Sequence, residues 1–390
     1  MSPVEELIVK KRVIICAGPG GVGKTTAAAA IALEAARMGR RSCVVTIDPA
    51  KRLADALGLE ELTNEARQVN GVPGVEDGRG GLWALMLDTK TTFDEVVRRN
   101  AGTAEQAEAI LDNRLYRNIS GALGGTLEYM AMEKLYELNQ SGLFDLVVVD
   151  TPPTRHALEF LDAPGRLLRF LNNRIFRLLM MPTRAGLRAV GVATQVFLRT
   201  ISRVVGGAIV KDAVAFFAAF EGMEQGFRDR ATRVEELLTD DGTAFVLVSS
   251  PRRDAVAESV FFADRLRESS GRVGARGAAG ARGAAGAPRA PAGGLGAPAG
   301  GLGAPAGGLG ALIVNRMFPA FGPVPEGLDG DLALNMAQLH QVARSEEQHV
   351  AELTARLPGT PVVRVPFLSD DVHDVEGLAE VGAWMLGRGR

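Results

Sequence analysis

The sequence predicts an α/β protein with a doubly wound, mainly parallel sheet and an inserted helical subdomain. Short runs rich in β-branched residues alternate with longer stretches of helical periodicity along the 390 residues. Most of these runs are continuously apolar, which is typical of strands that helices cover on both faces. The predicted strands are Arg12–Ala17, Ser42–Ile47, Leu82–Leu87, Leu146–Val149, Ala244–Ser249, Leu312–Val314 and Pro361–Val365.

The first predicted strand leads into the glycine-rich stretch CAGPGGVGKTTAAAA, residues 16 to 30. This stretch matches the phosphate-binding pattern G-x-x-x-x-G-K-[ST] and lies between a strand and an alanine-rich helix, as that pattern requires. Its glycines let successive N–H groups point at phosphate oxygens, and the helix adds its positive end. The residues expected to bind a nucleotide are Gly18, Gly20, Gly21, Val22, Gly23, Lys24, Thr25 and Thr26. Lys24 is expected to reach the β- and γ-phosphates, and the Thr25 hydroxyl to bind Mg²⁺.

Composition limits the classes of protein that remain. The chain is 46% hydrophobic with a net charge of −2, so it is large and apolar enough for a full core, and no nucleic-acid partner is expected. It has neither a secretory leader nor eighteen consecutive apolar residues, which predicts a cytoplasmic protein. Cys16 and Cys43 lie in predicted strands and form no C-x-x-C, so we expect two small buried hydrophobes.

Two aspartates follow predicted strands. Asp48 lies in VVTIDPAKRLADALG, and Asp150 lies in FDLVVVDTPPTRHALEFL. The carboxyl ends of parallel strands are where such sheets bind ligands, so both carboxylates should face the nucleotide. Asp150 is expected to help hold Mg²⁺, and Asp48 is then free to orient or deprotonate the attacking water.

The chain is predicted to have three kinds of segment. Long helical stretches without a strand interrupt the α/β pattern on either side of the strand at 146–149. The predicted nucleotide-binding core comprises 8–93, 143–154, 243–268 and 311–390, and the helical subdomain comprises 94–142 and 155–240. Residues 271–310, almost entirely Gly, Ala, Pro and Arg, are expected to be a disordered insertion because they cannot bury much apolar surface.

Four stretches together carry a specific resemblance: GGVGKTT, TIDPAKRLADALG, DTPPTRHALEFL and LIVNRMFP. Outside the insertion, most of the chain resembles the ArsA/GET family, ATPases that drive arsenite pumps or deliver tail-anchored membrane proteins. The resemblance implies ATP and Mg²⁺ as cofactors, Asp48 as the switch I residue that acts on water, and Asp150 as the start of switch II. It also implies that Asn315 reads the adenine edge, to which an amide can donate and from which it can accept. The stretch VPFLSDDVHDVEG resembles the family's loop beside the base.

Pro19 is the main departure from this resemblance. It replaces a lysine that, in the family, reaches across a dimer to the partner's nucleotide, so weak intrinsic hydrolysis is expected. Lys51, Arg52 or Arg155 is a candidate to supply the missing charge, Arg155 standing where the family usually has Gly. The family's arsenite-binding cysteines and paired-Cys zinc motif are absent, which disfavours arsenite transport.

The segment from residue 163 to residue 211 contains nine basic residues and no acidic one. Apolar residues recur at helical spacing between these charges, as in helices that bind an anionic membrane surface or a hydrophobic client. An ordinary helical subdomain, with the apolar stripe as its core, is an equal alternative.

These features favour a nucleotide-switch ATPase that couples a homodimer, or a heterodimer with a paralogue, to a hydrophobic or membrane-associated partner. The protein would then be cytoplasmic, with a peripheral membrane location open. Two alternatives remain: a positioning ATPase of the ParA/MinD kind, and a weakly active nucleotide-binding subunit of a heterodimer.

Overall fold

The computed structural model describes most of the chain in discrete ranges. These are 1–48, 52–75, 79–119, 126–153, 163–169, 171–172, 212, 215–216, 218–265, 309–319, 322–323 and 330–389. Three sets of predictions lie outside them: those for Lys51 and Arg155, those for most of the basic segment 163–211, and those for residues 271–308 of the insertion. Chain contacts divide the protein into two compact units. The first comprises Met1–Leu87, Leu135–Leu158 and Leu237–Arg390, and the second comprises Asp88–Lys134 and Glu159–Glu236.

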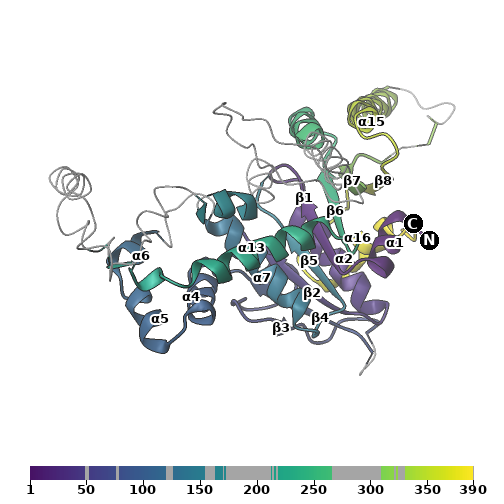
Figure 1. Ribbon diagram of the computed structural model, residues 1–390. Coiled ribbons are helices and arrows are strands. Elements are labelled where there is room, and N and C mark those ends of the chain that lie inside the picture. The colour runs from purple at the N-terminus through teal and green to yellow at the C-terminus, as the bar shows by residue number, and fades with distance from the viewer. Residues whose placement is uncertain are drawn as a thin grey trace, which may run out of the picture. The chain divides into compact units, whose positions relative to one another are not determined.

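An eight-stranded sheet forms the centre of the first unit, in the order β3-β4-β2-β5-β1-β6-β7-β8 (Figure 1). Its strands are β1 Val13–Ala17, β2 Arg41–Thr46, β3 Arg67–Gln68, β4 Gly81–Met86, β5 Leu146–Asp150, β6 Thr243–Ser249, β7 Leu309–Met317 and β8 Val362–Pro366. All neighbours are parallel except β3 and β4. The predicted α/β class and mainly parallel sheet are therefore confirmed. Strand β1 lies between β5 and β6, where the order in which strands are added to the sheet reverses. Sheets of this type bind ligands at that switch point.

The seven predicted strands are all present, with small differences at their ends. The two-residue strand β3 was not predicted, because Arg67 and Gln68 carry no apolar pattern. Strand β7 begins at Leu309, so Leu309 and Gly310 belong to the sheet and not to the insertion as predicted. The reason is pairing: Leu309 lies opposite Phe245 of β6.

Helix α2, Lys24–Arg37, directly follows the glycine-rich loop and packs against neighbouring helices of the first unit. Its alanines are almost completely buried, and the small side chains let it lie close to β2, β5 and α16, Val375–Met385. The other helices of this unit are α1 Pro3–Lys10, α3 Arg52–Ala56, residues 253–265 and α15 Asp331–Ala355. The chain ends lie side by side in Figure 1, and Arg388 pairs with Glu5 at 2.8 Å. Because α2 is almost completely buried, the junction between the glycine-rich loop and α2 lies in the core of the first unit.

The second unit is helical and has a core of its own, in which Phe220 stacks on Phe216 and packs against Phe227. Its helices are α4 Thr89–Asn100, α5 Ala104–Leu111, α6 Arg114–Ile119, and most of α7 Thr126–Gln140 and α13 Glu224–Thr239. The buried carboxylate of Glu133 is compensated by the guanidinium of Arg230. Among the described residues, no helix is both long and apolar enough to span a bilayer.

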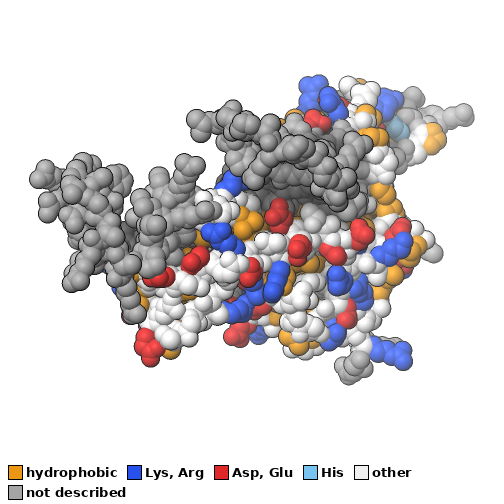
Figure 2. Space-filling view, viewed as in Figure 1, with side chains coloured by type: hydrophobic (Ala, Val, Ile, Leu, Met, Phe, Trp, Pro, Cys, Tyr) orange, Lys and Arg blue, Asp and Glu red, His pale blue; other side chains and the backbone are white. Residues whose placement is uncertain are grey.

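The surface that Figure 2 shows carries basic and acidic side chains side by side over the described residues. Neither sign gathers into a continuous patch on that face, in keeping with the small net charge of −2. The two cysteines are buried as predicted, and burial raises the pKa of the Cys16 thiol.

Candidate functional site

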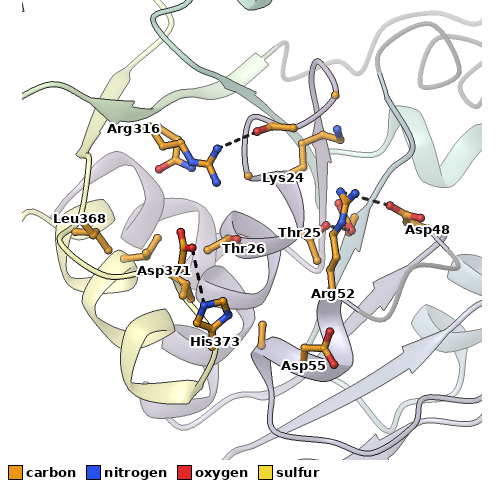
Figure 3. Close-up of a pocket in the computed structure, with 18 of the residues that line it drawn as sticks. Lys24, Thr25, Thr26, Asp48, Arg52, Asp55, Arg316, Leu368, Asp371 and His373 are labelled. Atoms are coloured by element: carbon orange, nitrogen blue, oxygen red, sulfur yellow. Dashed lines mark hydrogen bonds and ion pairs between the residues drawn. The ribbon is translucent and has the colours of Figure 1, made fainter.

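A cavity of about 600 Å³ opens at the carboxyl end of the sheet, within the first unit (Figure 3). That volume is within the roughly 300–1,000 Å³ usual for small-molecule sites. The glycine-rich loop, the ends of β2, β5 and β7 and the loop after β8 meet there, and residues of α3 and α16 complete the lining. Among the predicted site residues, the cavity is lined by Gly20, Gly21, Gly23, Lys24, Thr25, Thr26, Asp48, Asp150 and Asn315. Gly18 and Val22 are buried behind them.

The glycine-rich loop needs glycine at two positions for different reasons. A Cβ on Gly18 would lie 1.9 Å from the carbonyl oxygen of Val248, a backbone atom that cannot move aside. A Cβ on Gly23 would lie 2.3 Å from Asn315 Nδ2, and Gly23 also has a φ of 92°, which disfavours other residues. The loop is thus closely packed between β6 and β7 while its front faces the cavity.

Lys24 is the buried cation of the site. Its Nζ donates to the carbonyl oxygen of Pro19 at 2.8 Å, so the side chain folds back over the loop. Burial lowers the pKa of Lys24, and the carboxylate of Asp150 opposes that shift. A phosphate would be a stronger acceptor for this ammonium group than a neutral carbonyl.

Asp150 forms a compact cluster with two threonines. Its Oδ2 accepts hydrogen bonds from Thr25 Oγ1 at 2.6 Å and from Thr46 Oγ1 at 3.0 Å. Asp150 ends β5 opposite Thr46 of β2, so neighbouring strands place both groups at the same level. The carboxylate is 1% exposed, and burial raises its pKa against the effect of the Thr25 hydrogen bond.

The donor set at Asp150 fits a magnesium ion. The second oxygen, Oδ1, is buried and has no hydrogen-bond partner among the described residues. Carboxylate and hydroxyl oxygens are the ligands that Mg²⁺ prefers, usually with several waters retained. Thr25 and Asp150 are therefore suited to hold Mg²⁺ directly or through water.

Asp48 and Arg52 lie on the open side of the cavity. The Asp48 side chain is 36% exposed and that of Arg52 is 69% exposed, and Arg52 Nη1 lies 4.0 Å from Asp48 Oδ2 (Figure 3). The Asp48 N–H donates to Thr46 Oγ1 at 3.3 Å, which links this residue to the Asp150 cluster. The Asp48 carboxylate is thus placed where it could accept a hydrogen bond from a water molecule next to the phosphate-binding loop.

Asn315 lies behind the loop and its amide contacts the loop backbone. Nδ2 donates to the carbonyl oxygen of Val22 at 2.9 Å, and the side chain is buried. An amide NH₂ carries two hydrogens, so this bond uses neither the second hydrogen nor Oδ1. The late loop resembling the family's base loop contributes Phe367 and Leu368 to the same cavity. The adenine-reading role remains a prediction.

Sequence reasoning missed two residues that the structure brings to the site. Thr46 supports Asp150, although a strand-end threonine carries no signal of its own in one sequence. Arg316 lines the cavity next to Asn315, and its Nη1 lies 3.4 Å from the carbonyl oxygen of Gly21. A basic residue within the quoted stretch LIVNRMFP was the available signal.

A phosphate-binding loop at the switch point of a parallel sheet, with an acid at the end of the adjacent strand, defines a P-loop nucleotide-binding protein. The family model described as anion-transporting ATPase, ArsA_ATPase, matches residues 11–273. The chain therefore belongs to this ATPase family, and the predicted ArsA/GET resemblance is confirmed.

Curated relatives point to the same family over part of their length. The protein named ATPase GET3 from Malassezia globosa is 32% identical over 158 residues, 40% of this chain and 44% of the relative. ATPase get3 from Aspergillus terreus is 29% identical over 177 residues, 44% of this chain and 49% of the relative. ATPase get3 from Aspergillus niger is 27% identical over 175 residues, again 44% and 49%. In these matches the chain spans just under half of the relatives' length.

Proposed function

We propose that the chain binds MgATP and hydrolyses it as a nucleotide switch of the ArsA/GET type. The observation that carries this proposal is the cluster at the floor of the cavity. There, Thr25 and Asp150 are joined at 2.6 Å, and Asp150 keeps a buried oxygen without a hydrogen-bond partner among the described residues. Buried polar atoms are nearly always satisfied, so this oxygen is best explained by a cation ligand.

Each site residue has a distinct part in the proposed reaction. Lys24 leaves the Pro19 carbonyl for the β- and γ-phosphates, while the loop N–H groups bind the remaining phosphate oxygens. Thr25 and Asp150 would hold Mg²⁺, which neutralises charge that develops on the phosphates. Asp48 orients the attacking water and accepts its proton, and Asn315 contacts the adenine edge.

Slow turnover is part of the same proposal. Pro19 can neither reach a partner's phosphate nor donate an N–H from the loop. A cation that stabilises a phosphoryl-transfer transition state contributes roughly 10³–10⁵-fold in rate, so the chain alone should bind ATP better than it hydrolyses it. Of the three residues proposed to supply charge in place of that lysine, only Arg52 lies in the described part of the chain. Its guanidinium lies beside the carboxylate of Asp48.

ATP would close a dimer and thereby change the helical unit that holds a hydrophobic or membrane-associated partner. The relatives named ATPase GET3 support a switch of this kind. Pro19 favours one further candidate: a weakly active subunit of a heterodimer, whose paralogue carries the lysine. Added paralogue would then stimulate hydrolysis that the isolated chain lacks.

The test is calorimetric titration with MgATP of the parent chain, of Lys24→Ala and of Lys10→Ala. Lys10 is exposed on α1 and pairs with Glu6, so its removal controls for loss of a positive charge. We expect Lys24→Ala to weaken MgATP binding at least about 100-fold, because it removes a cation from the floor of the site. Unchanged melting temperature would show that the fold is intact, and undiminished affinity would show that this loop is not the site.

A further inference from the structure

Arg316 has an unusual backbone for a residue at the end of a strand. Its φ is 60°, and it is the only non-glycine residue with a positive φ in the described part of the chain. The β7–β8 register shifts between Val314 and Met317, so the irregularity coincides with Arg316. Strained conformations of this kind persist where the surrounding structure enforces them, and they concentrate at functional sites.

The positive φ at Arg316 lets two consecutive side chains contact the glycine-rich loop. In a regular strand, neighbouring side chains point to opposite faces of the sheet. Here the side chains of Asn315 and Arg316 both reach the glycine-rich loop. Asn315 donates to the carbonyl oxygen of Val22 at 2.9 Å, and Arg316 lies 3.4 Å from that of Gly21. The turn at Arg316 therefore has a geometric consequence: it directs a guanidinium group toward the loop that binds phosphate.

The Arg316 guanidinium is weakly held and lies between two cavities. Besides the main cavity, it lines a second one of about 480 Å³ that also contains Pro19, Gly20 and Phe367. Among the described residues it forms no ion pair, and 3.4 Å is long for an N–H···O hydrogen bond. Lys24, in contrast, is buried, and Arg52 Nη1 lies 4.0 Å from Asp48 Oδ2. Arg316 is thus an exposed cation that lines the second cavity together with Pro19.

We propose that Arg316 binds the phosphate chain of the nucleotide and supplies, from the end of β7, positive charge that the loop lacks at Pro19. This proposal rests on the MgATP-binding function proposed above. On binding, the guanidinium exchanges its contact with the neutral Gly21 carbonyl for charge-assisted hydrogen bonds to phosphate oxygens. The phosphate belongs either to the nucleotide in the same cavity or to that of a second copy of this chain.

The test uses three changes at this position and one matched control. Arg316→Gln removes the charge, Arg316→Lys keeps it, and Arg316→Gly removes it while relieving the positive φ. The control is Arg364→Gln, an exposed arginine on β8 that pairs with Glu347 at 3.1 Å outside both cavities. MgATP affinity is measured by calorimetry, and hydrolysis is measured at saturating MgATP.

We expect Arg316→Gln and Arg316→Gly to weaken MgATP binding about tenfold, or to slow hydrolysis by a similar factor, because one charge-assisted contact is lost. Arg316→Lys should recover much of the loss, and Arg364→Gln should behave as the parent does. A merely structural role predicts a different pattern, in which Arg316→Gly is at least as good as the parent because it removes the strain.

Mixing two defective chains separates the two sources of phosphate. Lys24→Ala chains keep Arg316 but should bind MgATP at least about 100-fold more weakly, and Arg316→Gln chains keep the loop. Recovery of hydrolysis on mixing supports contact across a dimer. If mixing restores no hydrolysis, and Arg316→Gln alone binds MgATP more weakly than the parent at every dilution, Arg316 contacts the nucleotide of its own cavity. If the parent binds MgATP and neither Arg316→Gln nor Arg316→Gly changes affinity or rate, the inference is wrong. If the parent does not bind MgATP, the proposed function itself has failed.

Discussion

The floor and the rim of the cavity differ in how firmly their charges are held. On the floor, Lys24 and Asp150 are buried and take part in hydrogen bonds of 2.6 to 3.0 Å. On the rim, Arg52 is 4.0 Å from Asp48, and Arg316 is 3.4 Å from a carbonyl oxygen. The floor charges are therefore buried and held by short hydrogen bonds, while the guanidinium groups of Arg52 and Arg316 are exposed and make longer contacts.

The difference between buried and exposed charges predicts that MgATP affinity and hydrolysis rate depend on different residues. In the proposed function, Lys24 contacts the phosphates and Thr25 and Asp150 hold Mg²⁺, so affinity should depend mainly on these three buried or half-buried groups. Transition-state stabilisation needs charges close to the γ-phosphate, and the rim must close to provide them. Under the proposed function, the absence of a lysine at position 19 should therefore lower turnover more than it lowers MgATP affinity.

The largest expected effect within this comparison comes from Asp48 on the rim. Asp48→Asn keeps the shape of the side chain but removes the base, so hydrolysis should fall by about 10²–10⁴-fold. MgATP affinity should stay within about threefold, because the floor is unchanged. Steady-state hydrolysis and calorimetry measure the two quantities. The control is Asp229→Asn on α13, an exposed carboxylate that accepts a hydrogen bond from Gln225. Parental turnover in Asp48→Asn would assign this residue another role.

A smaller, opposite effect is expected from Pro19→Lys. The new ammonium group restores a rim cation, so hydrolysis should rise by roughly tenfold or more where two chains face each other. Affinity should change little, since Gly20 to Thr25 keep their N–H donors. The rate is measured across protein concentration. A flat rate in Pro19→Lys together with a lower rate in Arg52→Ala would show that the cation is already supplied within the chain.

The smallest expected effect is on the stability of the free protein. Burial raises the pKa of Asp150. A carboxyl group whose pKa is raised on folding stabilises the folded state at low pH, and that contribution is lost as the pH rises through the folded pKa. Asp150→Asn does not titrate and keeps an acceptor for Thr25. It should therefore melt above the parent at pH 8 without Mg²⁺, by about 2–4 °C for each 1 kcal/mol of burial cost that is removed.

The pH dependence provides the check on that stability prediction. The difference in melting temperature between Asp150→Asn and the parent should shrink as the pH falls toward 4, because the parent carboxyl then becomes protonated. Differential scanning calorimetry of both chains in magnesium-free buffer gives the comparison. A lower melting temperature for Asp150→Asn at pH 8 would mean that the ionised carboxylate stabilises the fold, contrary to the stated cause.

The sequence predicted the floor of the site more completely than its rim. Lys24 and Thr25 lie in the local pattern of a phosphate-binding loop, and Asp150 directly follows an apolar run, so their positions at strand ends could be predicted. The continuous apolar runs in turn predicted the strands and the parallel sheet. Arg316 could not be assigned, because its direction depends on a positive φ and a register shift that no local pattern shows. The contact of Asn315 with the loop backbone could not be predicted either, because the pairing of β7 with β6, which are far apart in the sequence, positions this residue.

The most direct test of the central claim is to measure MgATP binding and hydrolysis by the unmodified chain over a range of protein concentrations. The floor predicts clear saturable binding at every concentration, and the absence of a lysine at position 19 predicts slow turnover per chain, with a rise at high concentration only where Arg316 contacts the nucleotide of a second copy. Absence of MgATP binding would contradict the assignment of the floor. Brisk hydrolysis at dilutions where only monomers exist would contradict the proposal that a missing cation at position 19 slows turnover.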